Sequence, residues 1–174
     1  MIEECSKGVL KAQEKLYKKF YNYGMSIAIR YAHNTDTAGE IYNDSFLKVL
    51  KNCSRFNGEK SYKAWLRKII VHTAIDNYRK EIKQENPIDP FDYKDAVSQT
   101  YIIEKLVAED IIRLIHGLPH IYRIVFSLYE LEGYSHEEIA SKLNLSVSTS
   151  RSCLSRAKSK LRHLIAVHHE IKKK

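Results

Sequence analysis

Cysteine, proline and glycine are scarce in this sequence of 174 residues, which contains three, three and six of them respectively. The cysteines, Cys5, Cys53 and Cys153, are scattered, odd in number and nowhere in a CxxC pair. A structural zinc site needs closely spaced cysteines and a complete disulfide framework needs an even number, so neither is expected. Buried or incidental reduced thiols are the better interpretation.

The sequence also lacks the marks of a membrane protein and of several enzyme classes. No apolar run is long enough to span a bilayer, and the polar, amphipathic start is not expected to be a signal peptide, so a cytoplasmic location is expected. No glycine-rich phosphate loop, nucleophile beside a base or distinct carboxylate pair is visible. His163, His168 and His169 lie on a basic tail, where solvated histidines are a better interpretation than a metal site. We expect a non-enzyme with no catalytic residues, cofactor or metal.

What the sequence does contain is positive charge and helical periodicity. The formal net charge is +8, which favours a polyanionic partner such as nucleic acid or an acidic membrane surface. Apolar residues recur at helical spacing along most of the chain, and no strand pattern or solenoid repeat competes with it.

Helices are expected throughout the first half. An early helical stretch is interrupted near Gly24, or two helices meet there. The next helix begins at a capping box formed by Thr37 and Glu40. Its buried face comprises Tyr42, Phe46, Val49, Leu50 and Cys53. A further helix is capped by Ser61 and continues to about Lys83.

A change of composition divides the chain into two domains. Residues 84–100 hold two of the three prolines and three aspartates, and this acidic stretch between basic flanks is typical of an interdomain linker. We therefore expect an all-α fold of two small helical domains, residues 1–84 and 101–174, joined by a flexible linker over residues 85–100.

Residues 133–162 have the pattern of a helix-turn-helix that continues into a long basic helix. Ser135 and Glu138 have the spacing of a capping box, Asn144 suits a left-handed turn, and Ser146 can cap the second helix. Such a helix fits the major groove of DNA. The alternative is a plain helical hairpin with a solvated basic face. DNA binding is the better interpretation because independent features coincide in the order that a DNA reader needs.

Both halves of the chain resemble the extracytoplasmic function (ECF) sigma factors of the sigma-70 family. The residues that match region 4 are Leu118, Pro119, Arg123, Phe126, Leu128, 133–135, 138–140, 156–158 and Leu161. Those that match region 2 are Leu16, Tyr17, Tyr21, 40–50, Arg55, Phe56, Gly58, Glu59, Ser61, Tyr62, 64–66, Ile69, Ala74, Asp76 and Arg79. The resemblance covers nearly the whole chain, in the right order and at the right separation.

This resemblance implies a factor that binds core RNA polymerase, recognises the −35 and −10 promoter elements and assists DNA melting. The implied polymerase-binding residues are Glu40, Asp44, Lys48 and Lys51. Those implied for the −10 element are Phe56, Asn57, Lys60, Ser61, Tyr62, Lys63, Arg67, Lys68, His72 and Arg79. Those implied for the −35 element are Ser148, Thr149, Arg151, Ser152, Ser155, Arg156 and Lys160. The implied partners are core RNA polymerase and promoter DNA, with an anti-sigma factor as a candidate regulator and no membrane insertion.

Some positions have more than one interpretation. Trp65 fits a core position because it is in register with Ile69, whereas Phe56 and Tyr62 fit the core and the DNA interface equally well. Ser150 stands where the family usually has Val, so the helix-turn-helix core is expected to be slightly weaker there.

Two other functions remain open. A repressor or activator that binds DNA without polymerase predicts tight operator binding and dimer symmetry. An adaptor whose basic faces meet lipid or RNA predicts no sequence preference.

Overall fold

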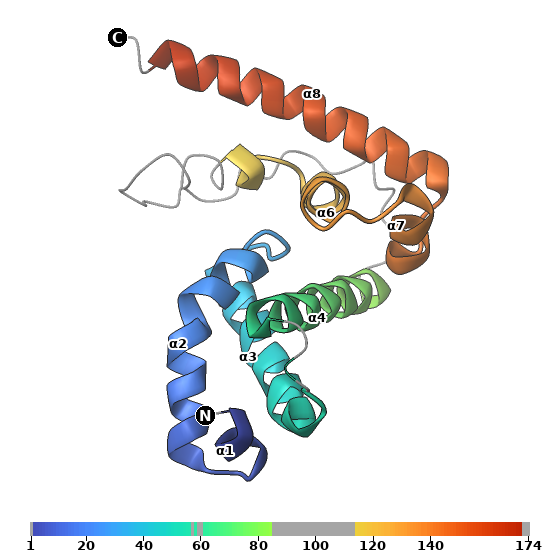
Figure 1. Cartoon of the computed structure of the whole chain (residues 1–174). Coiled ribbons are helices and arrows are strands. Elements are labelled where there is room, and N and C mark those ends of the chain that lie inside the picture. Colours follow the sequence, from blue (N-terminus) through green and yellow to red (C-terminus); the bar gives the residue numbers. More distant parts are fainter. Residues whose placement is uncertain (1, 57, 59–60, 85–113, 172–174) are drawn as a thin grey trace. The chain divides into compact units, whose positions relative to one another are not determined.

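The computed structural model describes residues 2–56, 58, 61–84 and 114–171. Every regular element in these ranges is helical, and the chain divides into two compact units, Met1–Tyr78 and Arg79–Lys174 (Figure 1). The predicted all-α, two-domain fold is confirmed. The linker predicted for residues 85–100 lies outside the described residues. Among the described helices, none is both long and apolar enough to cross a membrane.

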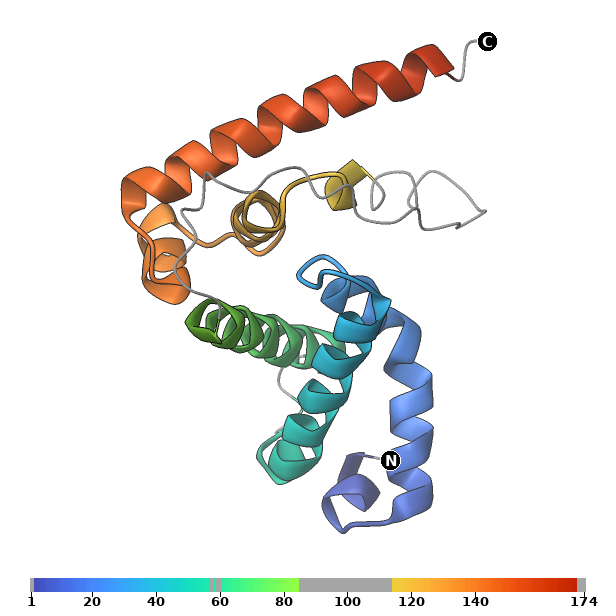
Figure 2. The same ribbon diagram turned by 180° about the vertical axis from the view of Figure 1, so that it is seen from behind.

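In the described part of the first half, the structure has four α-helices and one 3₁₀ turn. They are α1 (Ile2–Ser6), α2 (Leu10–Ala28), α3 (Thr35–Asn52), η1 (Cys53–Arg55) and α4 (Tyr62–Gln84). Helices α2 and α3 lie side by side, and α1 packs against α2 and η1 (Figures 1 and 2). The largest fully buried side chains of this unit include Leu16, Ile27, Tyr42, Val49, Leu66 and Ile70.

Helix α3 begins earlier than the predicted capping box. The Thr37–Glu40 box is wrong: the N-cap is Asn34, which has an extended backbone and whose Oδ1 accepts a hydrogen bond from the Thr37 amide at 2.8 Å. Asn is among the best N-cap residues, so the helix gains three residues at its start. The predicted buried face is confirmed for Tyr42, Phe46, Val49 and Cys53, and Leu50 is half-buried.

Helix α2 runs through Gly24 without the predicted interruption. A Cβ atom at this position would collide with the ring of Tyr42 from α3. That ring is fully buried, and its hydroxyl donates to the Tyr17 carbonyl oxygen at 3.0 Å. Gly24 is thus explained by close helix packing, which the sequence of α2 alone does not reveal.

Replacing Gly24 by alanine should therefore destabilise the protein. Alanine favours a helix interior by about 1 kcal/mol over glycine, but forcing Tyr42 aside in a packed core costs typically about 1–3 kcal/mol. Gly39 in α3 is the matched control, because a Cβ there would have nothing within 4 Å. Urea unfolding followed by circular dichroism should show a lower midpoint for Gly24→Ala and an unchanged or higher one for Gly39→Ala. A Gly24→Ala protein as stable as the parent would contradict the close contact.

The second half contains α6 (His120–Phe126), the π-helical turn η2 (Ser127–Leu131), α7 (His136–Leu143) and α8 (Val147–Ile171). Helix α8 packs against both α6 and α7 (Figure 2). Its apolar side buries Cys153, Leu154, Ala157 and Leu161. Ala157 and Leu161 join Ile115 and Leu118 in one cluster.

Candidate nucleic-acid interface

The start and end of α7 follow the local chemistry of the sequence. The Ser135 hydroxyl accepts from the Glu138 amide at 3.2 Å, while the Glu138 carboxylate accepts from the Ser135 amide at 2.8 Å, completing the predicted capping box. The helix ends at Asn144, whose φ of 57° and ψ of 46° are left-handed. Asn tolerates this conformation better than most residues. Ile139, Ala140 and Leu143 form the buried face, as predicted.

Helix α8 has one buried side and one exposed side. Its start is capped by Ser146, whose hydroxyl accepts from the Thr149 amide at 3.0 Å. The Thr149 hydroxyl also bonds Ser146, at 2.7 Å, so it is engaged within the cap. Of the residues implied for the −35 element, five are exposed and two are half-buried. The exposed residues are Ser148, Arg151, Ser152, Ser155 and Arg156, and the half-buried ones are Thr149 and Lys160. The helix therefore presents a polar, basic surface on the side opposite its core.

Both arginines of that surface have partners within the second half. Arg151 Nη2 lies 3.4 Å from Glu137 Oε1 of α7, and both side chains are about two-thirds exposed. Arg156 Nη1 donates to the Tyr122 hydroxyl of α6 at 3.2 Å. Exposed ion pairs contribute little to folding, so a DNA phosphate or base edge can compete for Arg151.

Ser150 lies in the core of the helix-turn-helix, at the position where the family usually has Val. It is fully buried, and its hydroxyl shares a 3.0 Å hydrogen bond with His136 Nδ1 of α7. The His136 ring in turn stacks on Tyr129 of η2, with ring centroids 4.6 Å apart. A contact between residues 14 positions apart has no signature in the sequence, so sequence reasoning missed the hydrogen bond that satisfies this buried hydroxyl.

All three cysteines are free and buried, as expected. Burial raises the pKa of the Cys153 thiol from an ordinary value of 9.0 to about 11, against an opposing effect of the nearby Arg156 charge. Because the thiolate is the nucleophilic form, a buried thiol with a raised pKa is unreactive near neutral pH. Cys153 is therefore a packing residue of α8.

The folded protein should accordingly resist alkylation at Cys153. Treatment with iodoacetamide near neutral pH, followed by peptide mapping, should leave this thiol unmodified in the native state and modify it fully in urea. Its native-state reactivity should rise as the pH approaches 11, where the folded-state thiol ionises. Equal labelling rates with and without urea would contradict the burial.

An aromatic cluster lies at the start of α4 and includes Phe56, the residue that follows η1. Phe56, Tyr62 and Trp65 contact one another, with ring centroids 5.1–5.8 Å apart. The Phe20 ring packs against Tyr62 at a tilt of 45°, with ring centroids 4.5 Å apart. Phe56, Tyr62 and Trp65 are all half-buried. Burial raises the pKa of the Tyr62 hydroxyl. The rings therefore support one another and keep partial access to solvent.

Most other −10 candidates are exposed on or next to α4. Ser61 caps this helix by accepting from the Ala64 amide at 3.2 Å, as predicted. Lys63, Lys68, His72 and Arg79 are exposed and Arg67 is half-buried. The Lys63 ammonium lies 5.4 Å from the centroid of the Tyr23 ring. Asn57 and Lys60 lie outside the described residues.

The four polymerase-binding candidates share the exposed face of α3. Glu40, Asp44, Lys48 and Lys51 are all exposed, opposite the buried side of the helix. Leu47 lies at the same helical spacing and is 56% exposed. The sequence-based candidates did not include Leu47. Its position does not fall on the buried spacing of α3, and this could have marked Leu47 as an exposed apolar residue. This face therefore combines charges of both signs with a large apolar side chain.

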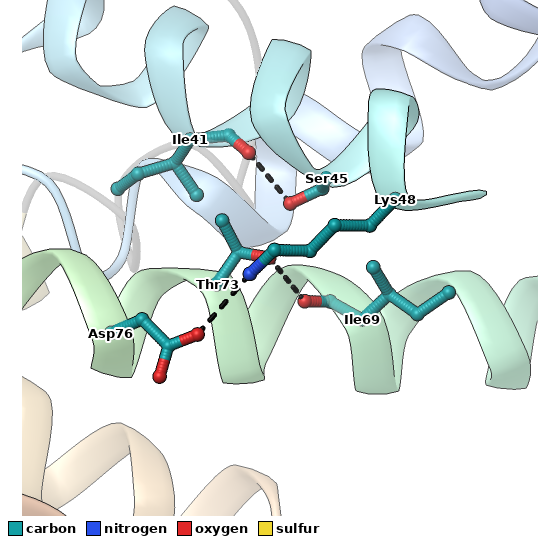
Figure 3. Close-up of polar contacts among 6 residues, drawn as sticks. All are labelled: Ile41, Ser45, Lys48, Ile69, Thr73 and Asp76. Carbon is teal, nitrogen blue, oxygen red and sulfur yellow. Dashed lines mark hydrogen bonds and ion pairs between the residues drawn. The ribbon is translucent and has the colours of Figure 1, made fainter. Parts of the chain in front are cut away.

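One member of that face is engaged with α4. The Lys48 ammonium lies 3.1 Å from Asp76 Oδ2, and both side chains are about half exposed. Figure 3 shows this pair between the two helices. Beside it the Ser45 hydroxyl donates to the Ile41 carbonyl at 2.6 Å, and Thr73 donates to Ile69 at 2.9 Å. These hydroxyls are satisfied within their own helices, so among the six residues drawn the polar contact between α3 and α4 is the Lys48–Asp76 pair.

Comparison with known families and proteins decides the relationship. The family model for sigma-70 region 2 matches residues 16–83, and that for sigma-70 region 4 matches residues 108–161. The chain belongs to the sigma-70 family. The names of its relatives place it in the ECF group, a group of transcription initiation factors rather than catalytic enzymes.

Two curated relatives span almost the same length as this ECF sigma factor. RNA polymerase sigma factor YlaC of Bacillus subtilis is 28% identical over 156 residues, covering 86% of this chain and 89% of that one. The ECF RNA polymerase sigma-E factor of Haemophilus influenzae is 27% identical over 178 residues, covering 95% and 93%.

A solved structure resembles the ECF sigma factor in fold. It is the sigma factor RpoE from Bartonella quintana, crystallised in complex with the anti-sigma factor NepR. The TM-score is 0.54 at 21% sequence identity, over 90% of this chain and 98% of that one.

Proposed function

We propose that this ECF sigma factor binds core RNA polymerase and directs promoter-specific initiation. It recognises the −35 element through α8, recognises the −10 element through α4 and the preceding loop, and assists DNA melting. The observation that carries the proposal is the row of exposed Arg and Ser side chains on the first turns of α8. They lie opposite a buried face, in a helix-turn-helix with both predicted caps.

The −35 assignment is supported by the side-chain chemistry of that row. Arg151 and Arg156 can donate two hydrogen bonds to a guanine edge or to phosphate, and Ser148, Ser152 and Ser155 can bond either groove or backbone atoms. Thr149 is proposed as a backbone contact through its amide at the helix start, because its hydroxyl bonds Ser146. Lys160, further along and half-buried, is proposed as a phosphate contact.

The −10 assignment is supported by basic residues placed next to an aromatic cluster. Lys63, Lys68, His72 and Arg79 are exposed and can follow a phosphate backbone, while half-buried Phe56 and Tyr62 offer ring edges to an unpaired base. Extracting a base from its stack costs a few kcal/mol, which contacts with these rings would offset. Arg67, Ser61, Asn57 and Lys60 complete the proposed set.

The docking assignment is supported by the composition of the exposed face of α3. Glu40, Asp44 and Lys51 surround the exposed Leu47, and an apolar centre with a charged rim is typical of protein interfaces. Lys48 would have to leave Asp76 to reach a partner. Core polymerase and promoter DNA are the proposed partners, and an anti-sigma factor is a proposed regulator.

The proposed function assigns a role to each part of the chain and a location to the protein. Residues 1–84 are proposed as the polymerase-binding and −10 domain. Residues 85–100 form the linker and residues 101–174 the −35 domain. A factor that acts on chromosomal promoters works in the cytoplasm.

Run-off transcription tests the proposed function. The purified chain, mixed with core polymerase from its own host, should co-elute with that enzyme and yield specific transcripts from genomic promoter fragments. Core polymerase alone is the control. Failure of both co-elution and specific transcription would overturn the proposal. Tight sequence-specific binding of the free chain would instead indicate a repressor or activator, and binding without sequence preference would indicate an adaptor.

A further inference from the structure

Two polar contacts connect the first turn of α7 with the first turn of α8. His136 bonds Ser150 at 3.0 Å, and the next residue in each helix makes the second contact, Glu137 to Arg151 at 3.4 Å. The first contact is buried on the α8 side, where Ser150 is fully inaccessible, and the second is exposed. The buried contact therefore lies directly beside the arginine proposed to read the −35 element.

His136 is itself fixed from a third element. Its ring stacks on Tyr129 of η2 with an interplanar angle of 26°. The adjacent Glu130 forms an ion pair of 2.7 Å with Lys158, two turns further along α8. The π-helical turn thus contacts both the His136 ring and a second point of α8.

Burial makes the His136–Ser150 bond sensitive to substitution. Removing one partner of a buried hydrogen bond leaves the other unsatisfied, whereas replacing both partners by apolar groups of similar shape can be nearly neutral for stability. Apolar side chains could therefore fill the same space. What the His136–Ser150 hydrogen bond adds is a fixed direction between the two side chains, and so between α7 and α8.

We propose that His136 and Ser150 are a positioning pair that sets the rotation and tilt of the first turn of α8, and with it the aim of Arg151 at the −35 element. Successive helical residues point about 100° apart, so anchoring Ser150 toward α7 turns Arg151 to the flank of the helix. Recognition geometry must be held to within about 0.5 Å by such supporting contacts. The inference rests on the proposed function, because it assigns a role in −35 recognition.

The first test compares two substitutions of nearly identical shape at Ser150. Thr retains the hydroxyl and Val replaces it with a methyl group. The measurement is transcription by the reconstituted holoenzyme across a library of −35 point variants. Ser150→Thr should keep the parental preference profile. Ser150→Val should reduce preference at the position read by Arg151 by about fivefold or more, the lower end of what one bidentate Arg–base pair contributes.

The double variant His136→Phe/Ser150→Val separates positioning from folding. Phe keeps the ring stacked on Tyr129 but has no nitrogen, so neither partner of the bond is left unsatisfied. The thermal midpoint of the double variant should lie closer to the parental value than that of Ser150→Val alone. The −35 preference of the double variant should stay altered. A double variant with both parental stability and the parental preference profile would overturn the positioning role, as would identical profiles for Ser150→Thr and Ser150→Val.

Arg151→Ala distinguishes this inference from the function on which it rests. If Arg151→Ala changes the preference profile and the double variant does not, only the positioning pair is wrong. If Arg151→Ala itself leaves the profile unchanged, Arg151 does not recognise the −35 element. The proposed positioning of Arg151 by His136 and Ser150 is then wrong as well.

Discussion

Replacing Asp44 by arginine should weaken binding of the chain to core RNA polymerase by about 2–5 kcal/mol, the cost of losing a charge-paired contact at a partly buried interface. Asp44 is exposed on α3, on the same face as Leu47 and opposite the buried Tyr42. The substitution should therefore leave the helical content unchanged. Binding is measured by titrating labelled protein with core polymerase, and folding by circular dichroism.

Glu14→Arg is the matched control for this charge reversal. Glu14 is exposed on α2, where it pairs with Lys18 one turn away, and the substitution changes net charge by the same amount. If the docking face is on α3, Glu14→Arg should bind polymerase almost as tightly as the parent. Equal affinities for parent and Asp44→Arg would move the docking surface elsewhere, while equal losses in both variants would indicate a general charge effect.

The helix-turn-helix could be predicted closely because its determinants are local. The capping box joins Ser135 to Glu138, the Ser146 cap reaches Thr149, and each pair is separated by three residues. The left-handed turn depends on the tolerance of Asn144 itself. Short-range preferences of this kind can be read directly from sequence.

Contacts between helices could not be predicted in the same way. Gly24 looked like a helix break because glycine disfavours helix interiors, but its role is set by Tyr42, 18 positions away. The Lys48–Asp76 pair depends on how α3 and α4 pack, which the periodicity of neither helix defines. The Thr37–Glu40 box failed for another reason: the N-cap is Asn34, three residues earlier, and local preferences do not decide between two residues that can both cap a helix.

The candidate sites followed the same division. Exposure of the candidate docking residues and of five of the seven −35 candidates followed from amphipathic spacing, since the opposite faces of α3 and α8 are apolar. Thr149 and Lys160 are half-buried. The side chains that the exposed candidates contact within the protein could not be predicted from that spacing. Arg151 contacts Glu137, Arg156 contacts Tyr122, and these contacts require the positions of three helices at once. Sequence alone therefore identified which side chains face outward, but not how each is held before a ligand arrives.

The positions of Arg151 and Arg156 along α8 lead to different expected effects of their substitution. Arg151→Ala should relax sequence preference at one −35 position, because Arg151 lies in the first turns of the helix, where side chains reach base edges. Arg156→Ala should weaken binding more evenly across sequences. It should also reduce the slope of log K against log salt concentration by about one unit, as expected for the loss of a phosphate contact. The assay is holoenzyme binding or transcription across a −35 point-variant library at several salt concentrations.

Tyr122→Phe is the control for Arg156, since it removes the hydroxyl that Arg156 bonds without altering the charge of α8. If Arg156 acts through DNA phosphate, Tyr122→Phe should keep the parental salt dependence while Arg156→Ala does not. If the two variants change binding alike, the effect of Arg156 comes from packing between α6 and α8. If Arg151→Ala and Arg156→Ala both retain parental selectivity and affinity, α8 is not the reader and its exposed basic side is a solvated surface.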